Sequence, residues 1–175
     1  MTTFVIFGIA FGAIVTFSAA FLRVPPQGYK PAGWSPPAPA PGAKVVKAEY
    51  GPGEMVATLP FWLLWIEYVI AAGVGLIVIS QASPIGQEVA KLTPVVAGGA
   101  LTILAVFNGL GRPGFGYISD AIGRSRSMAL IFAVYIAALM FVLPNATTFG
   151  TYVVGLCMVG FAFGGTLALM PAFTA

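Results

Sequence analysis

Charged residues, histidine and cysteine are scarce in this 175-residue sequence, and each shortage excludes a class of function. Only 7% of the residues are charged, and histidine, the commonest general base and metal ligand, does not occur. Cys157 is the single cysteine, so the sequence offers neither a disulfide framework nor a cysteine cluster for a metal. No nucleophile stands beside a base at a usable spacing. We therefore predict that the protein is not an enzyme and that it holds no cofactor and no metal.

Apolar residues are abundant instead. They make up 59% of the chain, against about 45–50% in ordinary soluble domains, and the mean hydropathy is +0.97. A water-soluble core of this size could not hide so much apolar surface, so we predict an integral, multi-pass membrane protein whose partner is the lipid bilayer. The net charge of +3 comes from Lys and Arg residues spread among membrane spans, and it indicates topology and not a nucleic-acid partner.

Five apolar segments are each long enough to cross a bilayer as a helix, which takes about 20 residues. The alternation of barrel strands is absent, so the predicted fold class is all-α, with polytopic transmembrane helices. The first segment lacks a basic leader region and a small-residue cleavage site, and we interpret it as a span and not as a signal peptide. The predicted spans are Thr3–Leu22, Leu59–Ser80, Thr93–Ile118, Ser127–Leu143 and Phe149–Met170.

A proline-rich linker, residues 23–58, separates the first two spans. Residues 23–54 hold eight of the chain's 14 prolines, which predicts an extended, partly polyproline-like segment without helix. Tyr29 and Trp34 in this linker are expected to anchor at lipid headgroups. A docking site for a partner protein is the alternative interpretation of the same prolines.

The basic residues predict the orientation. Six of the eight Lys and Arg residues fall in the linker 23–58 and in the loop 119–126, whereas the loops on the other side contain only Lys91. Basic loops face the cytoplasm, so the linker and the loop 119–126 are predicted to be cytoplasmic, in a bacterial-type plasma (inner) membrane. The six residues are Arg23, Lys30, Lys44, Lys47, Arg124 and Arg126.

That loop carries the motif Gly116-x-x-x-Asp120-x-x-Gly123-Arg124. Gly116 is expected to permit a close helix approach, and Gly123 to permit the tight turn of a helical hairpin. Asp120 and Arg124 are expected to contact neighbouring helix ends and so to form a conformational latch. The motif resembles the cytoplasmic-loop signature of the major facilitator superfamily. An ordinary charged hairpin that only fixes topology is the alternative.

A narrower resemblance covers nearly the whole chain. FLRVPPQGYKPAGW (residues 21–34), FWLLWIEYVIAAGVGLIVISQASPIGQE and NGLGRPGFGYISDAIGR resemble the oxalate/formate antiporter family. This resemblance implies a partial major facilitator fold that runs from the end of the N-terminal half to about helix ten. Residues 1–22 would be the last helix of that half, 23–58 the central linker, and 59–175 about four helices of the C-terminal half. The remaining helices of a full-length transporter would then be partners of this chain.

Arg112 lies deep in the third predicted span. It precedes Asp120 by eight residues, about 12 Å along a helix and close to the midplane of a ~30 Å hydrocarbon core. A guanidinium offers two parallel donors to a carboxylate, and the family resemblance implies an essential arginine on this helix. We therefore predict that Arg112 binds a small carboxylate substrate such as oxalate or formate. In that family aromatic rings surround the dicarboxylate, whereas the last span here has few of them, which argues against oxalate itself.

Asn108 and Glu67 refine this interpretation. Asn108 is one helical turn before Arg112 and is predicted to share its face as a second substrate-binding residue. Asn108-x-x-x-Arg112-Pro113 resembles the Asp-x-x-x-Arg-Pro of monocarboxylate transporters, but asparagine cannot titrate, which favours exchange over proton symport. Glu67, at a similar depth in the second span, either couples or gates transport or forms an ion pair with Arg112.

Three functions remain open from the sequence. The first is carboxylate exchange by alternating access. The second is proton-coupled monocarboxylate symport through a titratable group such as Glu67. The third is a non-transporting membrane scaffold or subunit, if the chain is complete. The glycines at 98, 99, 109, 111, 114 and 116 in the third span predict close helix packing, with a flexible gate as the alternative.

Overall fold

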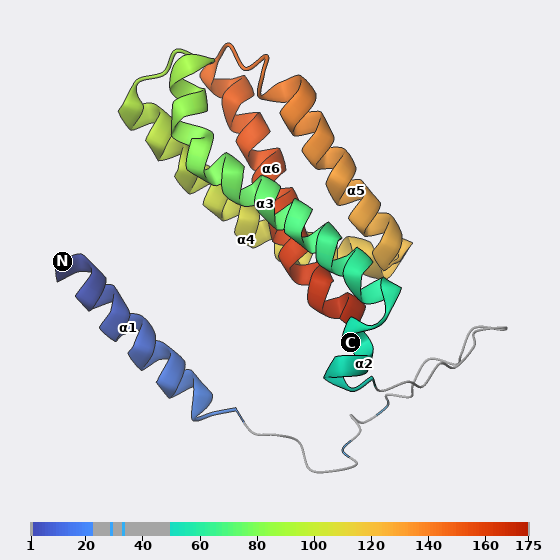
Figure 1. Ribbon diagram of the computed structural model, residues 1–175. Helices are drawn as coiled ribbons and strands as arrows, with labels where there is room; N and C mark the ends of the chain where they lie inside the picture. Colours follow the sequence, from blue (N-terminus) through green and yellow to red (C-terminus); the bar gives the residue numbers. More distant parts are fainter. Residues whose placement is uncertain (1, 23–28, 30–32, 34–49, 175) are drawn as a thin grey trace. The chain divides into compact units, whose positions relative to one another are not determined.

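The computed structural model describes residues 2–22, 29, 33 and 50–174, and the described part contains helices and no strands (Figure 1). The chain divides into two units, residues 1–48 and 49–175. The first contains the apolar helix α1, Thr2–Ala19, none of whose residues is buried. Most of the predicted extended linker, including Trp34 and the basic residues Arg23, Lys30, Lys44 and Lys47, lies outside the described residues.

The second unit is a helical bundle. Its elements are α2 Pro52–Val56, α3 Leu59–Glu88, α4 Pro94–Ile122, α5 Arg124–Ala137 with its π-helical continuation η1 Ala138–Val142, and α6 Phe149–Thr174. Within the described ranges, five helices are long and apolar enough to span a membrane: α1, α3, α4, α5 with η1, and α6. The predicted all-α class and the five predicted spans are therefore confirmed.

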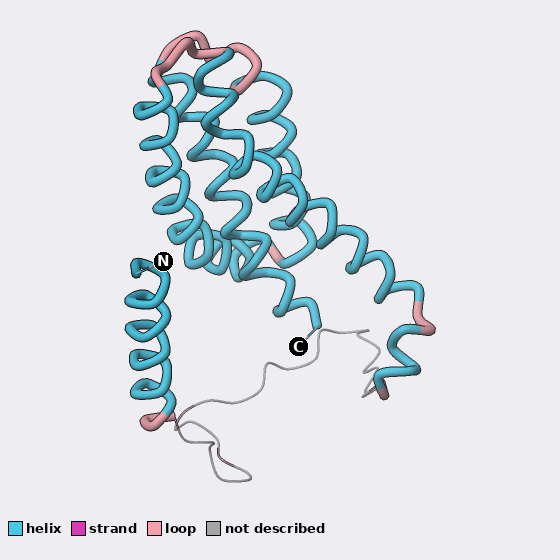
Figure 2. Tube along the Cα trace, turned by 60° about the vertical axis from the view of Figure 1, so that its left-hand side comes forward, coloured by secondary structure: helices cyan, strands magenta, loops and turns pink. Residues whose placement is uncertain are grey.

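Consecutive long helices of this unit run in opposite directions. Figure 1 shows the α3–α4 and η1–α6 connections at one end, and Figure 2 shows the same arrangement from another side. The α4–α5 turn, α2 and the end of α6 lie at the opposite end. At the α4–α5 turn, Gly123 has φ +90°, a conformation that L side chains rarely adopt. The expected role of Gly123 in a tight turn is confirmed.

Helix α6 packs on α3, α4 and α5, and most extensively on α4. The contact between α4 and α6 is close because glycines face backbone. A Cβ on Gly164 would collide with the carbonyl oxygen of Asn108, and one on Gly160 would lie 2.6 Å from the carbonyl oxygen of Leu104. Small residues let membrane helices approach in this way. These two glycines of α6 therefore let the backbones of α4 and α6 lie in close contact.

The glycines of α4 divide into two groups. A Cβ on Gly111 would collide with the carbonyl oxygen of Phe161, and one on Gly114 would lie 2.6 Å from that residue's ring. A Cβ on Gly98, Gly99, Gly109 or Gly116 would meet nothing within 4 Å. Gly116 lies five residues after Gly111, about 140° around the helix, and so faces away from α6. A close helix approach at Gly116 is therefore not observed among the described helices, and its expected role stays a prediction.

The described helices differ from the sequence expectations at two places. Helix α3 continues through Pro84 to Glu88, beyond the predicted end at Ser80, because polar side chains there bond within the helix: the Gln87 amide donates to the Ser83 carbonyl at 3.2 Å. The helix ends at Glu88; beyond it, Lys91 has φ +54° and the Leu92 amide donates to the Gly86 carbonyl at 3.0 Å, which satisfies one of the carbonyls in the last turn of the helix.

The segment 23–54 was expected to lack helix, yet α2 begins at Pro52. Proline suits the first helical position because its missing amide hydrogen has no intrahelical role there. The Glu54 carboxylate accepts a hydrogen bond of 3.0 Å from the amide of Gly51, the residue that precedes the helix. Thr58 and Trp62 then donate to the Met55 and Val56 carbonyls, which ties α2 to the start of α3.

Candidate functional site

Arg112 lies on an exposed side of α4, ten residues from the helix's C-terminal end at Ile122. Its neighbour Gly111 is buried against α6, so one step of about 100° around the helix separates a packed position from an open one. Among the residues that the structure describes, Arg112 forms no hydrogen bond and no ion pair. Its guanidinium therefore keeps its donors available to another molecule or another part of the protein.

Glu67 is half-buried on α3, and it makes no ion pair with Arg112. The described bundle therefore does not contain the Glu67–Arg112 ion pair that the sequence analysis gave as an alternative. Glu67 lies on α3 and Arg112 on the exposed part of α4, and no contact joins the two side chains in the described bundle. Glu67 remains a titratable group within a membrane-spanning helix.

Asn108 lies one turn before Arg112 and is half-buried. Its amide nitrogen Nδ2 is buried and has no hydrogen-bond partner. The backbone of Asn108 lies against α6, since a Cβ on Gly160 would lie 3.4 Å from the backbone nitrogen of Asn108. A buried amide without a partner is uncommon in folded proteins and is a reason to look for a ligand.

Asn108 also lines a cavity between α3, α4 and α6, with a volume of about 310 Å³. Arg112 is not part of its wall. The step of four positions from Asn108 to Arg112 corresponds to about 6 Å of rise and 40° of rotation, so both residues lie on the same side of α4, as the sequence predicted. The residues that line the cavity are Ile79, Leu101, Leu104, Ala105, Asn108 and Phe163.

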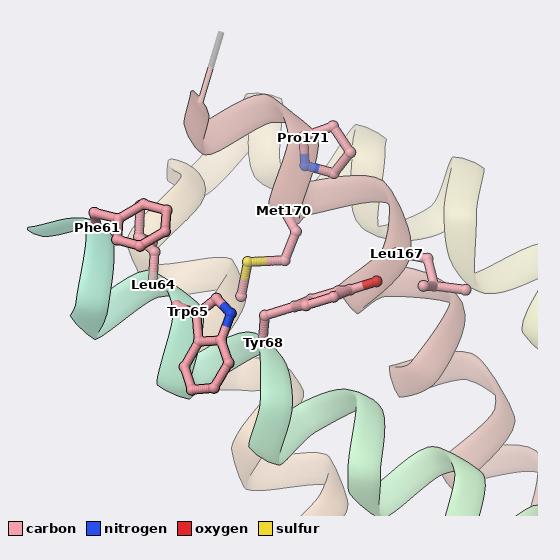
Figure 3. Close-up of a pocket in the computed structure, with 7 residues that line it drawn as sticks. All are labelled: Phe61, Leu64, Trp65, Tyr68, Leu167, Met170 and Pro171. Carbon is pink, nitrogen blue, oxygen red and sulfur yellow. The ribbon is translucent and has the colours of Figure 1, made fainter. Parts of the chain in front are cut away.

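A second cavity, of about 280 Å³, lies between the start of α3 and the end of α6 (Figure 3). Phe61, Trp65 and Tyr68 line it from α3, and the Tyr68 ring extends toward α6. Our sequence reasoning missed this cavity, although the spacing of these three aromatics (i, i+4, i+7) places them on one helix face. Met170 and Leu167 complete the wall from the other helix. Only the packing of the two helices brings them together.

The motif residues lie at the end of the bundle where α4 turns into α5. Arg124 donates a hydrogen bond from its guanidinium to the carbonyl oxygen of Ala172, near the C-terminus of α6. Carbonyls at a helix C-terminus carry partial negative charge, which favours a cation there. Asp120 is exposed in the last turn of α4. The motif thus connects the α4–α5 turn to the end of α6 through Arg124.

Within the described residues, no group of three His, Cys, Asp or Glu side chains lies close enough to hold a metal ion. The long apolar helices, their close packing through glycines and a deep arginine without an ionic partner in the described bundle define a multi-pass integral membrane protein.

Comparison with known proteins finds two similar transporters. The chain is 28% identical over 171 residues to the oxalate:formate antiporter of Oxalobacter formigenes, which covers 94% of this chain and 37% of that protein. It is 32% identical over 174 residues to the uncharacterized MFS-type transporter YhjX of Escherichia coli (strain K12), with 97% of this chain and 40% of the relative covered. Over nearly its whole length this chain is therefore similar to membrane transporters, one of which is a transporter of the major facilitator type.

The two relatives carry the names of transporters and not of enzymes. The chain spans 37% and 40% of their respective lengths. No family model matches the sequence.

Proposed function

We propose that the protein transports small carboxylates by alternating-access exchange, with Arg112 as the residue that binds the anion. The observation that carries this proposal is an exposed Arg112 without an ionic partner in the described bundle, on a helix of otherwise apolar character. It lies ten residues from the end of α4, about 15 Å in a core of ~30 Å. A charge at that depth is costly unless it meets a partner or a water-filled cavity.

A carboxylate is the anion that suits this arginine. The planar guanidinium can donate two parallel hydrogen bonds to the two carboxylate oxygens, and such charge-assisted pairs are stronger than neutral ones. One of the two relatives carries the name of an antiporter for two carboxylates, oxalate and formate. This name supports exchange of anions of that class here.

We assign α1 to the last helix of the N-terminal half, residues 23–58 to the cytoplasmic linker and residues 59–175 to the start of the C-terminal half. In this arrangement, the exposed side of α4 faces the other half of the transporter across the substrate. The two halves rock about that central site, as in other secondary transporters. The latch comprises Gly116, Asp120, Gly123 and Arg124 on the cytoplasmic side, where the bond from Arg124 to α6 supports its role.

Proton-coupled monocarboxylate symport is the second candidate. The observation that favours it is Glu67, a half-buried carboxyl on a membrane-spanning helix without an ion pair to Arg112. Uptake into proteoliposomes separates the two mechanisms. Exchange requires a carboxylate inside the vesicle and does not respond to a pH gradient, whereas symport requires the gradient and no internal substrate.

The substitution Arg112→Lys, made in the complete protein, tests whether Arg112 binds the anion. Lysine retains the charge but loses the two-pronged donor, so we expect carboxylate uptake to fall by about tenfold or more, equivalent to about 1.4 kcal/mol or more of transition-state stabilisation. The amount of protein inserted in the membrane should not change. The measurement is the initial rate of labelled carboxylate uptake into proteoliposomes.

Arg126→Lys is the matched control, because Arg126 is an exposed arginine in the first turn of α5 with no hydrogen bond in the described bundle. It should transport at the unmodified rate. If Arg112→Lys also transports normally, Arg112 does not bind the anion and the proposed function loses its main support.

A further inference from the structure

The cavity beside Asn108 has an almost entirely apolar wall. Five of its six lining residues are hydrophobic, and they come from three helices: Ile79 from α3; Leu101, Leu104 and Ala105 from α4; and Phe163 from α6. Its volume of about 310 Å³ is in the range of a small-molecule site. Among the described residues, no lysine or arginine contributes to this wall. A ligand that fills the cavity must therefore present hydrocarbon to most of its surface.

The cavity is held open by the bundle itself. A Cβ on Gly75 would collide with the ring of Phe163, so the absence of a side chain at Gly75 lets this ring lie against α3. Phe163 belongs to α6, is 9% exposed and contributes the wall of the cavity on the α6 side. The shape of the site thus depends on an aromatic ring that belongs to a helix of the bundle.

Asn108 supplies the single polar side chain of the wall, and its amide nitrogen has no partner in the described bundle. An unsatisfied buried donor is unfavourable, so a ligand that accepts a hydrogen bond there gains free energy. Rotation of the amide about its last side-chain bond exchanges its oxygen and nitrogen ends. Asn108 can therefore direct an N–H group toward a bound anion.

Arg112 does not line the cavity, but it follows Asn108 by one helical turn on the same side of α4. Side chains on a helix tilt toward its N-terminus, so the long Arg112 side chain can extend toward the level of Asn108, about 6 Å away along the axis. Ala105, which lines the cavity, lies about 20° around the helix from Arg112 by the same geometry. The charge and the cavity are thus on adjoining parts of one side of α4.

From these contacts we propose that the cavity binds the apolar tail of a monocarboxylate whose carboxylate group is held by Arg112 and Asn108. This inference rests on the proposed function and specifies its substrate class. A dicarboxylate as short as oxalate has no hydrocarbon to place against the wall. Its second charge would also find no cation among the lining residues, and burial of an unpaired charge is strongly unfavourable.

Binding measurements on the unmodified protein test the substrate class. Isothermal titration calorimetry of the purified protein, as its gene encodes it, would compare acetate, butyrate, hexanoate and oxalate. A buried methylene group strengthens binding by about fourfold, so the dissociation constant should fall about fifteenfold from acetate to butyrate. It should fall further for hexanoate, and oxalate should bind more weakly than butyrate.

A variant that fills the cavity tests the location. Ala105→Leu adds hydrocarbon to the wall and should weaken hexanoate binding by about tenfold or more, while acetate binding changes by less than about twofold. Val106→Leu is the matched control, because Val106 is the next residue, is 55% exposed and does not line the cavity. It should leave the whole series unchanged.

The outcomes separate this inference from the function on which it rests. If acetate or oxalate binds more tightly than butyrate, or if Ala105→Leu and Val106→Leu shift all acids equally, the tail site is wrong while carboxylate binding stands. If none of the acids binds, both the site and the proposed carboxylate function fail. Because the series on the unmodified protein decides the substrate class, a variant that does not fold leaves the test intact.

Discussion

At the residue scale, Gly111 and Arg112 are adjacent in the sequence and have opposite surroundings. Gly111 is pressed against the Phe161 carbonyl of α6, whereas Arg112 is exposed and forms no bond in the described part of the bundle. The close packing on one side of α4 holds the helix in place. It therefore also sets the direction in which the arginine is presented on the other side.

Gly164 should be intolerant of even one added carbon. A Cβ at this position would collide with the Asn108 carbonyl, which is backbone and cannot move without displacing α4. We expect Gly164→Ala to destabilise the protein by about 1–3 kcal/mol, as other overpacked cores are destabilised. Thermal unfolding in detergent would detect this as a lower midpoint temperature.

Gly98→Ala is the control for this prediction, because a Cβ at Gly98 meets nothing within 4 Å. Alanine is favoured over glycine inside a helix by about 0.5–1 kcal/mol, so the midpoint should stay equal or rise slightly. An unchanged midpoint for Gly164→Ala would mean that α4 and α6 are not in the close contact described.

At the scale of elements, two buried tyrosines connect helices that are distant in sequence. The Tyr152 hydroxyl, at the start of α6, donates to the Ala82 carbonyl of α3 at 2.6 Å and lies 3.5 Å from the Ala97 carbonyl of α4. The Tyr135 hydroxyl of α5 donates to the Ala71 carbonyl of α3 at 3.2 Å. Helix α3 is thus held by polar contacts at two levels, in addition to its apolar packing.

Tyr152→Phe should separate the polar contribution from the apolar one. The variant removes only the hydroxyl, and loss of one such hydrogen bond costs about 0.5–1.5 kcal/mol. We expect a lower unfolding midpoint in detergent. Tyr117→Phe is the control, since Tyr117 is 80% exposed and has no hydrogen bond in the described bundle; equal midpoints for both variants would contradict the structural role of Tyr152.

At the scale of the whole molecule, the order of the helices sets which loops share one side of the membrane. The α4–α5 turn and the η1–α6 connection lie at opposite ends of the bundle (Figure 1). The positive-inside rule predicts that the first of these, which carries Arg124 and Arg126, faces the cytoplasm. The structure shows which loops lie at the same end of the bundle, and the basic residues predict which end faces the cytoplasm.

Cysteine labelling of intact cells tests this orientation. In a Cys157→Ser background, Thr147→Cys in the η1–α6 connection should react with a membrane-impermeant thiol reagent added outside. Ser125→Cys, in the α4–α5 turn region, should react only after the cells are opened. Both positions are exposed. The reverse pattern would show that the loop 119–126 is not cytoplasmic.

Much of the candidate site was accessible from the sequence because its signals are local. A charge inside an apolar run identified Arg112, and helical spacing placed Asn108 on the same side. The Glu67–Arg112 ion pair could not be judged in this way, because it depends on how α3 and α4 rotate against each other. The two cavities were not predicted at all, since their walls combine side chains from different helices.

The sequence by itself determined the membrane class, the five spans, the turn at Gly123 and the superfamily resemblance. Hydrophobicity over some twenty residues and the need for a positive φ at one position are properties of short segments. Only the tertiary structure decided which glycines pack, that Gly116 faces open space, and that an apolar cavity adjoins Asn108. These features depend on which faces of α3, α4 and α6 meet, and a single helix carries no information about its neighbours' positions.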